Sequence, residues 1–267
     1  MFCWNSTRLY GQPFVVHFIF ERIIEMCKEQ GCKGIYIDEN APNIIMLLFA
    51  DDMVFCSDIV ARLQKGLNLL EEYSVKWGLK VNLSKTKVMV FRRGGTLKKS
   101  EVWYYDGVKL DTTSAYKYLG LIFTPKGSWF TATKTLASQA SKAVAILNKI
   151  LWKCGDIPFN AAFELFDKMI LPILTYGSEV WGFTVYDNIE MVQRKFCRQY
   201  LKVSSTTSNV AVLGECGRHP LYIFYMTRCI KYWLKVLQME NTRYPNACYK
   251  MLKRLDDLGR PLKLDLC

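Results

Sequence analysis

The sequence lacks the residue clusters from which most zinc and disulfide sites are built. Its 267 residues include two histidines, His17 and His219, and none of its ten cysteines forms a Cys-x-x-Cys pair. Zinc needs several closely spaced Cys, His or carboxylate ligands, so a zinc site is not indicated. Reduced thiols in an intracellular protein, nuclear or cytoplasmic, fit these cysteines better than disulfides do.

Long apolar runs are missing as well. No run approaches the roughly 20 residues that a helix needs to cross a bilayer, and residues 1–10 show no clear secretory signal. We therefore expect no membrane partner and no export. No internal repeat or low-complexity tract is visible, and a hydrophobic content of 51% predicts a chain with a real core.

Negative charge is scarce relative to positive charge. The chain has 36 Lys and Arg against 24 Asp and Glu, which leaves a formal net charge of +12. An excess of this kind indicates a polyanionic partner, with nucleic acid first and an anionic membrane surface second.

The most informative stretch is residues 44–57, where two adjacent acids, Asp51 and Asp52, stand between two apolar runs. Apolar runs of this length predict short, fully buried strands, and the acids would lie in the tight turn that joins them. Carboxylates beside a core need a compensating cation, and Mg²⁺ suits because it takes hard oxygen ligands and needs one or two protein carboxylates. An ordinary Asp-Asp turn without metal is the alternative, and the pair alone does not decide between them.

The first half of the chain mixes helices with strands. Asp58 is a plausible N-cap for a helix over 59–77, which Gly78 would end. Asp106-Gly107 between apolar flanks is a strong hairpin signal. The other predicted elements are a helix over 14–27 and strands over 34–37, 87–91, 102–105, 108–110 and 116–124. The turn at 125–128 is the predicted domain boundary.

The second half is helical in pattern. The predicted helices cover 131 to about 151, 158–171 with a kink at Pro172, 187–202 and 221–238, with a linker at 204–209. The helix over 187–202 carries cations on the face opposite its apolar residues. That face could contact phosphates, or it could be a solvated basic face with no partner. The cations are Arg194, Lys195, Arg198 and Lys202.

Several segments occur in the order expected of one family. Phe49-Ala50-Asp51-Asp52, Trp77-Gly78-Leu79, residues 81–87 and residues 116–120 together resemble the C-terminal palm of a reverse transcriptase from a LINE-type (non-LTR) retrotransposon. Downstream, residues 171–182, 196–198 and 214–221 resemble the helical region that follows the palm in those elements. The resemblance covers roughly residues 31–240.

The resemblance implies an α+β fold in three parts. Residues 1–127 would be a partial palm, an antiparallel sheet with a packed helix. Residues 128–240 would be an all-α, thumb-like region, and residues 241–267 a loosely held tail.

The resemblance also implies roles for individual residues. Asp51 would coordinate Mg²⁺ with Asp52 beside it, and Lys85 would either assist the pyrophosphate leaving group or contact a phosphate. The implied nucleic-acid contacts are Phe49 and Ala50 at the acid turn, Tyr118, Leu119 and Gly120 at the primer grip, and the four cations of the helix over 187–202.

One component of the implied site is missing. Nucleotidyl transfer uses two metal ions about 3.5–4 Å apart, and the family supplies a third carboxylate from a neighbouring strand. Asp38 and Glu39 stand in the loop before the acid pair, which is the wrong place for it. We therefore expect a fragment of an RNA-directed DNA polymerase, with RNA template, DNA primer and dNTP as partners, that is inactive alone.

Two other interpretations stay open. One is a non-catalytic, basic nucleic-acid-binding module. The other is a non-functional gene remnant, which would be unstable because apolar sheet edges are left without a partner.

Overall fold

The computed structural model describes residues 2–5, 13–37, 43–50, 52–92, 94–155 and 157–259, with the backbone alone given for 2–5 and 13–20. The described residues form two compact units. The first contains the residues up to Leu119, then 124–127 and those from Met239 on. The second contains 120–123 and 128–238. The assignment of these units to palm and thumb stays a prediction.

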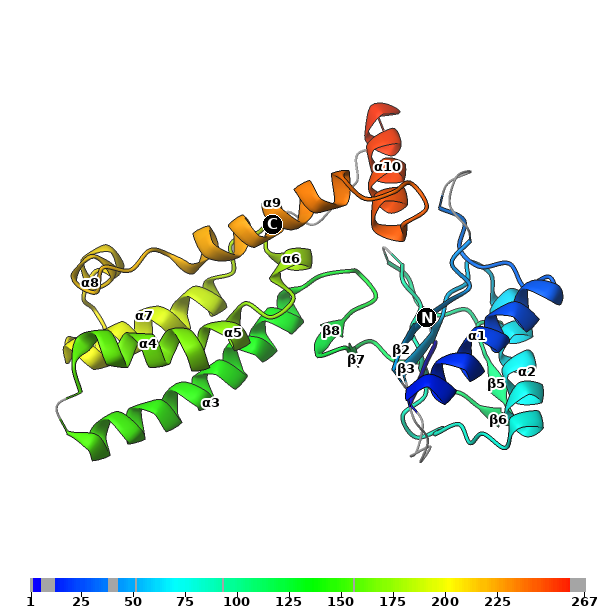
Figure 1. Cartoon of the computed structure of the whole chain (residues 1–267), viewed down its shortest axis with the longest axis horizontal. Helices are drawn as coiled ribbons and strands as arrows, with labels where there is room; N and C mark the ends of the chain where they lie inside the picture. The colour runs from blue at the N-terminus through cyan, green and yellow to red at the C-terminus, as the bar shows by residue number, and fades with distance from the viewer. Residues whose placement is uncertain are drawn as a thin grey trace. The chain divides into compact units, whose positions relative to one another are not determined.

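The first unit is built on a four-stranded sheet in the order β2-β3-β1-β4, of which β2 and β3 are labelled in Figure 1. Its strands are β1 (Phe2–Asn5), β2 (Met46–Phe49), β3 (Asp52–Phe55) and β4 (Lys87–Val88). β1 runs antiparallel to both β3 and β4. β3 and β4 therefore run parallel to each other and begin at the same edge of the sheet.

Two helices cover this sheet, α1 (Pro13–Glu29) and α2 (Val60–Trp77). Their apolar faces share one core with β3, in which Ile23 and Leu67 are fully buried. Gly78 ends α2 in the left-handed conformation, as predicted. The prediction that Asp58 caps α2 is wrong, because the capping position is Ile59 and the Asp58 carboxylate pairs with Arg62 one turn on.

The predicted hairpin at Asp106-Gly107 is confirmed. β5 (Tyr104–Tyr105) and β6 (Val108–Lys109) pair antiparallel, and both turn residues have positive φ, 49° and 68°. That is the geometry of a type I′ turn, which Asp-Gly favours. The predicted strand over 87–91 is shorter than expected, since β4 ends at Val88.

Residues 116–124 were predicted as one strand, and that prediction is wrong. They form β7 (Tyr116–Tyr118) and β8 (Leu121–Phe123), a two-stranded sheet joined at Leu119 and Gly120. Both joining residues have positive φ, 46° and 84°. An apolar run containing a glycine therefore folds back on itself where alternation alone indicated a continuous strand.

The prediction of a loosely held tail is wrong for α10 (Tyr244–Asp257). Ala247 on this helix is buried with Ile37, and Tyr244, Cys248 and Met251 pack around them. Proline at the start of the helix suits its first turn, where no amide donor is needed. Residues 260–267 of the predicted tail lie outside the described residues.

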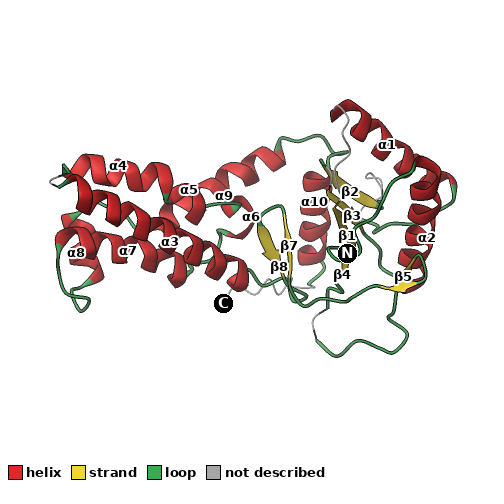
Figure 2. Ribbon diagram, turned by 90° about the horizontal axis from the view of Figure 1, so that it is seen from below, coloured by secondary structure: helices red, strands yellow, loops and turns green. Residues whose placement is uncertain are grey.

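The second unit is helical and is held together by one apolar core. It contains α3 (Phe130–Cys154), α4 (Phe159–Met169), α5 (Leu171–Leu174), α6 (Ser178–Trp181), α7 (Asp187–Leu201), α8 (Asn209–Glu215) and α9 (Leu221–Leu237). α3 packs along α7 and against α5 (Figure 2). Pro172 opens the short helix α5, so the predicted kink is a break between α4 and α5.

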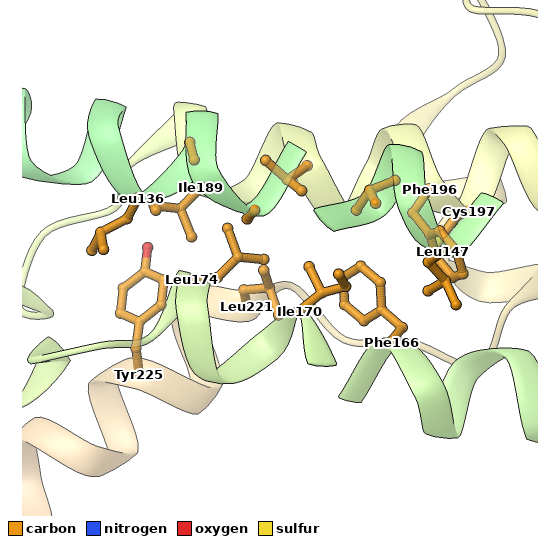
Figure 3. Packing of buried hydrophobic residues seen from close by; sticks show 14 of the residues in the cluster. Leu136, Leu147, Phe166, Ile170, Leu174, Ile189, Phe196, Cys197, Leu221 and Tyr225 are labelled. Carbon is orange, nitrogen blue, oxygen red and sulfur yellow. The ribbon is translucent and has the colours of Figure 1, made fainter. Parts of the chain in front are cut away.

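The core of this unit runs between α3, α4, α7 and α9 (Figure 3). Leu147, Phe166, Ile170 and Phe196 have no solvent exposure, and the rings of Phe166 and Phe196 stack with their centroids 4.7 Å apart. Helices and small antiparallel strand pairs together make the chain α+β, as predicted. None of the described helices has the length and hydropathy to span a bilayer.

Candidate functional site

The acid pair belongs to a tight β-hairpin. Phe49 of β2 pairs with Asp52 of β3, so the two strands are joined by Ala50 and Asp51. Ala50 has a positive φ of 50°, which a small residue tolerates in a turn. Asp51, the main predicted metal ligand, lies outside the described residues. Asp52 is half-buried and begins β3, so the prediction that both acids lie in the turn is wrong for Asp52.

Both apolar runs around the acids were predicted to be buried, and this is wrong for one of them. Met53, Val54 and Phe55 on β3 are almost fully buried, but Phe49 on β2 is 59% exposed. The reason is topology: β2 is an edge strand, so one of its sides has no neighbouring strand. Phe49 is therefore accessible beside the turn.

The sheet brings Lys85 to the same edge as Asp52. Lys87 of β4 pairs with Cys3 of β1, and Cys3 pairs with Val54 of β3. Asp52 precedes Val54 by two residues, and Lys85 precedes Lys87 by two residues. β3 and β4 run parallel two strand spacings, about 10 Å, apart, and Lys85 lies in the turn that leads into β4.

A tight turn holds the backbone of Lys85. The side chain of Asn82 accepts hydrogen bonds from Ser84 Oγ at 2.7 Å and from the Lys85 amide at 3.4 Å. The Tyr116 hydroxyl donates to the Lys85 carbonyl at 3.1 Å. With its backbone fixed in this way, the Lys85 side chain is exposed at the sheet edge.

The strand next to β3 has no acid at the matching level. β1 places Asn5 opposite Asp52, and its other residues are Phe2, Cys3 and Trp4. Among the described residues, no three His, Cys, Asp or Glu side chains gather closely enough to hold a metal ion. The sequence analysis expected no strand before residue 34, so this neighbour of β3 was missed. Its four residues give no clear strand pattern.

One of the residues predicted at the primer grip, Gly120, packs against Tyr176 within the second unit. Gly120 has a φ of 84°, and a Cβ there would lie 2.8 Å from Cε1 of Tyr176. Gly177 has a φ of 65°, and a Cβ there would lie 2.7 Å from Cδ1 of Leu121. Both positions therefore require glycine, for conformation and for space. Tyr118 is half-buried and Leu119 is 38% exposed.

The four cations predicted on α7 divide into two kinds. Arg194 pairs with Asp187, and Arg198 donates to the carbonyl of Thr207 at 2.8 Å and to Asn209. Lys195 and Lys202 are exposed, and no described residue pairs with either. The expectation of four available cations on this face is therefore wrong for the two arginines, which tie α7 to its own chain.

Two buried or half-buried charges of the second unit were missed by the sequence analysis. Glu190 on α7 accepts the amides of Leu221 at 3.0 Å and Tyr222 at 2.6 Å, which caps α9. Burial raises the pKa of Glu190, and these two hydrogen bonds oppose that effect. Arg218 donates to Asp167 at 2.8 Å. No local pattern could have identified these pairs, because the partners lie 31 to 51 residues apart.

The cysteines match the expectation of reduced thiols. All eight cysteines whose side chains the structure describes are free. Cys197 is fully buried, and burial raises its pKa to about 12, so it stays a neutral thiol. Cys229 is also fully buried and donates to the carbonyl of Ser178.

The chain is similar to a reverse-transcriptase family and to proteins of transposable elements. A family described as "Reverse transcriptase (RNA-dependent DNA polymerase)" matches residues 12–123. The "Putative 115 kDa protein in type-1 retrotransposable element R1DM" of Drosophila melanogaster is 25% identical over 201 residues, covering 70% of this chain and 19% of that protein. The "Probable RNA-directed DNA polymerase from transposon BS" of the same species is 23% identical over 176 residues, covering 62% and 19%.

A "Putative uncharacterized transposon-derived protein" of Caenorhabditis elegans is 29% identical over 147 residues, covering 54% of this chain and 51% of that protein. The chain thus spans about a fifth of the length of the two Drosophila relatives.

The ends of the family match lie close to the ends of structural elements. The family match begins at residue 12, so it includes α1, which the sequence analysis had left outside the resemblance. It ends at Phe123, the last residue of β8. An alignment of 201 residues has to extend beyond this point, so the similarity to the retrotransposon protein also reaches the helical unit. Residues 12–123 therefore carry the reverse-transcriptase family match, and the chain is similar to proteins of retrotransposable elements over a stretch that continues into the helical unit.

Proposed function

We propose that the first unit is a partial polymerase palm in which Asp51 and Asp52 bind Mg²⁺ and Lys85 faces the phosphates of an incoming dNTP. The observation that supports this proposal most strongly is the shared sheet edge. Asp52 and Lys85 are 33 positions apart in the sequence, yet Asp52 begins β3 and Lys85 lies in the turn that leads into β4, a strand that runs parallel to β3 about 10 Å away.

The residues at this edge fit a divalent metal ion in their chemistry. Two adjacent carboxylates supply the hard oxygen ligands that Mg²⁺ prefers. When bound, Mg²⁺ would supply Lewis-acid stabilisation of the transferring phosphoryl group. Lys85 would neutralise charge on the leaving pyrophosphate, as a plain cation or as a proton donor.

The same edge supports the proposal that these residues alone do not catalyse synthesis. β1 carries Asn5 where a third carboxylate would share a level with Asp52. A neutral amide binds a divalent ion more weakly than a carboxylate. We expect weak metal binding and no primer extension by this chain.

Hydroxyl-radical cleavage tests the metal site directly. Fe²⁺ in place of Mg²⁺, with ascorbate and peroxide, should cut the backbone near residues 50–52, and added Mg²⁺ should suppress the cut. Asp51→Asn and Asp52→Asn should each weaken the cleavage. The matched control is Asp106→Asn, which removes an exposed acid from the other tight hairpin turn and should change nothing.

The role of position 5 on β1, opposite Asp52, can be tested with a substitution that should increase Mg²⁺ binding. Residues opposite one another on neighbouring strands carry their side chains on the same face, so Asn5→Asp would add a carboxylate beside Asp52. This variant should strengthen Mg²⁺ binding, and its metal-directed cleavage should become stronger. Cleavage spread evenly along the chain, unaffected by Asp51→Asn and Asp52→Asn, would contradict the proposed site.

The second unit supports a thumb-like role in the same proposal. Lys195 on α7 and Lys202, which directly follows the helix, are exposed, and the chain carries a net charge of +12. Such cations hold a duplex through its phosphates without reading its sequence. The alternative function, a non-catalytic nucleic-acid-binding module, rests on these same cations and differs in needing no metal.

A further inference from the structure

We propose that a groove in the first unit, separate from the acid hairpin, binds the phosphates of a nucleic-acid backbone. The groove combines two adjoining hollows of about 660 Å³ and 380 Å³. Leu97, Thr112 and Thr113 line both hollows, so the two adjoin. Each has the size of a small-molecule site.

The groove has an excess of positive charge. Lys87, Lys98, Lys99 and Lys109 line its larger part, and Arg92 and Lys126 line the smaller part. The larger hollow has two acids, Asp111 and Glu101.

Both acids are already neutralised by cations of the same surface. Lys87 Nζ lies 2.6 Å from Asp111, and Arg92 lies 2.9 Å from Glu101. The Lys98 amide also donates to Glu101 at 2.6 Å. These hydrogen bonds hold the pKa of both carboxyls below their usual values. The acids are therefore charged at neutral pH, and each has one cation at ion-pairing distance, while Lys109 attracts Asp111 and Lys98 attracts Glu101 from farther away.

Three lysines of the larger hollow are left over. Lys98, Lys99 and Lys109 are exposed, and among the described residues no carboxylate pairs with them. Three like charges around one hollow repel one another, and an anion placed between them relieves that repulsion. Phosphate oxygens are the natural ligands for such a cluster.

The form of the groove favours a polymer over a free nucleotide. The unpaired cations are exposed at the surface, and no described polar side chain that lines the groove is fully buried, as a pocket for one defined ligand would require. Exposed cations along a groove suit a backbone that runs past them. We therefore assign the groove to single-stranded nucleic acid, held by charge and without sequence preference.

Fluorescence anisotropy with a labelled RNA of about 20 nucleotides tests this assignment. The measurement is made with EDTA and without dNTP, so it does not depend on the proposed metal site. The groove variant is Lys98→Gln/Lys99→Gln/Lys109→Gln. The control variant, Lys28→Gln/Lys76→Gln/Lys80→Gln, removes the same charge from exposed lysines of the same unit that do not line the groove.

The groove variant should bind about tenfold more weakly at moderate salt, and its slope of log K against log salt should fall by about 2, since each lost contact to a single strand removes about 0.7. The control variant should lose much less. A triple Lys→Arg variant of the groove should keep its binding, which separates charge from any effect on folding.

Three results would overturn the assignment. The control variant could lose as much affinity as the groove variant, so that net charge alone explains binding. The groove variant could bind as tightly as the unaltered chain. Tripolyphosphate could displace the RNA at the same phosphate concentration, which would make the ligand a free polyphosphate. Because RNA binding is measured in EDTA and metal binding by Fe²⁺ cleavage, failure of the metal proposal is recognised separately.

Discussion

The two units of this molecule use their cations differently. In the helical unit, Arg198, Arg218 and Arg228 each donate hydrogen bonds to distant residues of the same unit. In the sheet unit, Lys98 and Lys109 are exposed without a described carboxylate partner. Among these cations the engaged ones are arginines and the available ones are lysines, while Lys87 of the sheet unit is a lysine that pairs with Asp111 and Lys195 of the helical unit is an available one.

The side chains explain this division. The guanidinium group presents several donors in a planar fork and can satisfy two or three acceptors at once. Arg228 does so with Glu179 at 3.0 Å and the hydroxyl of Thr175 at 3.0 Å. The ammonium group of lysine is compact and strongly hydrated, so it stays in water until an anion arrives. The net charge of +12 does not say where the unpaired cations lie, and the structure shows where they are.

The largest expected effect tests whether the two units are independent. Phe166→Ala removes a fully buried ring that stacks on Phe196, and it should cost about 3–5 kcal/mol in the second unit. Hydrogen exchange followed by mass spectrometry should show faster exchange over 128–238 and unchanged protection of β3. The control Phe91→Ala removes a ring that is 48% exposed and should change stability by less than about 0.5 kcal/mol. If both units lost protection from exchange together, the two units would not be independent in stability.

A smaller effect sharpens the contrast between engaged and available cations. Arg218→Met breaks the hydrogen bonds to Asp167 and removes a cation lying 5.4 Å from the ring centre of Phe163. We expect a loss of about 1.5–3 kcal/mol in urea unfolding, as for hydrogen bonds to charged groups. Lys98→Met should stay within about 0.5 kcal/mol because that side chain is exposed. If both variants lost the same free energy of unfolding, the contrast between engaged arginines and available lysines would be contradicted.

The pH dependence of stability tests the buried acid of the helical unit. Burial raises the folded-state pKa of Glu190 above its ordinary value of 4.5. Its contribution to stability is therefore complete below the unfolded pKa and is lost as pH rises through the folded pKa. Glu190→Gln does not titrate, so the stability of the unaltered chain relative to this variant should fall between about pH 4 and neutral pH. A difference that is constant with pH would mean that this carboxyl is not perturbed.

The smallest expected effect concerns the basic face of α7. Lys195→Gln/Lys202→Gln should weaken binding to an RNA–DNA duplex severalfold and lower the salt slope by about 1–2, without changing stability. Arg194→Gln/Arg198→Gln should chiefly lower stability, because these side chains hold Asp187 and the 204–209 linker. Salt titrations of binding, paired with thermal melts, separate the two outcomes. Binding that ignores salt would exclude a phosphate-contact role for this face.

Local signals in the sequence carried the prediction of most elements. The Asp106-Gly107 turn and the Gly78 stop of α2 were predicted correctly because each depends on a residue that tolerates positive φ. The helix over 131 to about 151 was also predicted, and helical spacing places Ala140, Val144 and Leu147 on the buried face of α3. These features depend on neighbours a few positions away.

The errors fall where distant residues decide the outcome. Residues 116–124 read as one strand, but Leu119 and Gly120 turn the chain where Tyr176 packs against Gly120. Residues after 241 were predicted to be a loose tail, but Ala247 packs against Ile37, which lies more than 200 positions earlier in the sequence. Arg198 was predicted to be an available cation, but it donates hydrogen bonds to Thr207 and Asn209.

The sequence by itself determined the acid pair, the excess of positive charge and the ordered segments by which the family can be identified. Each of these is a property of residue type and order. Only the tertiary structure decided that Asp52 and Lys85 share a sheet edge, that Asn5 stands opposite Asp52, and which cations are occupied. The physical reason is that strand pairing and ion pairing join residues through space, and the energy of each contact depends on a partner whose sequence position carries no local signal.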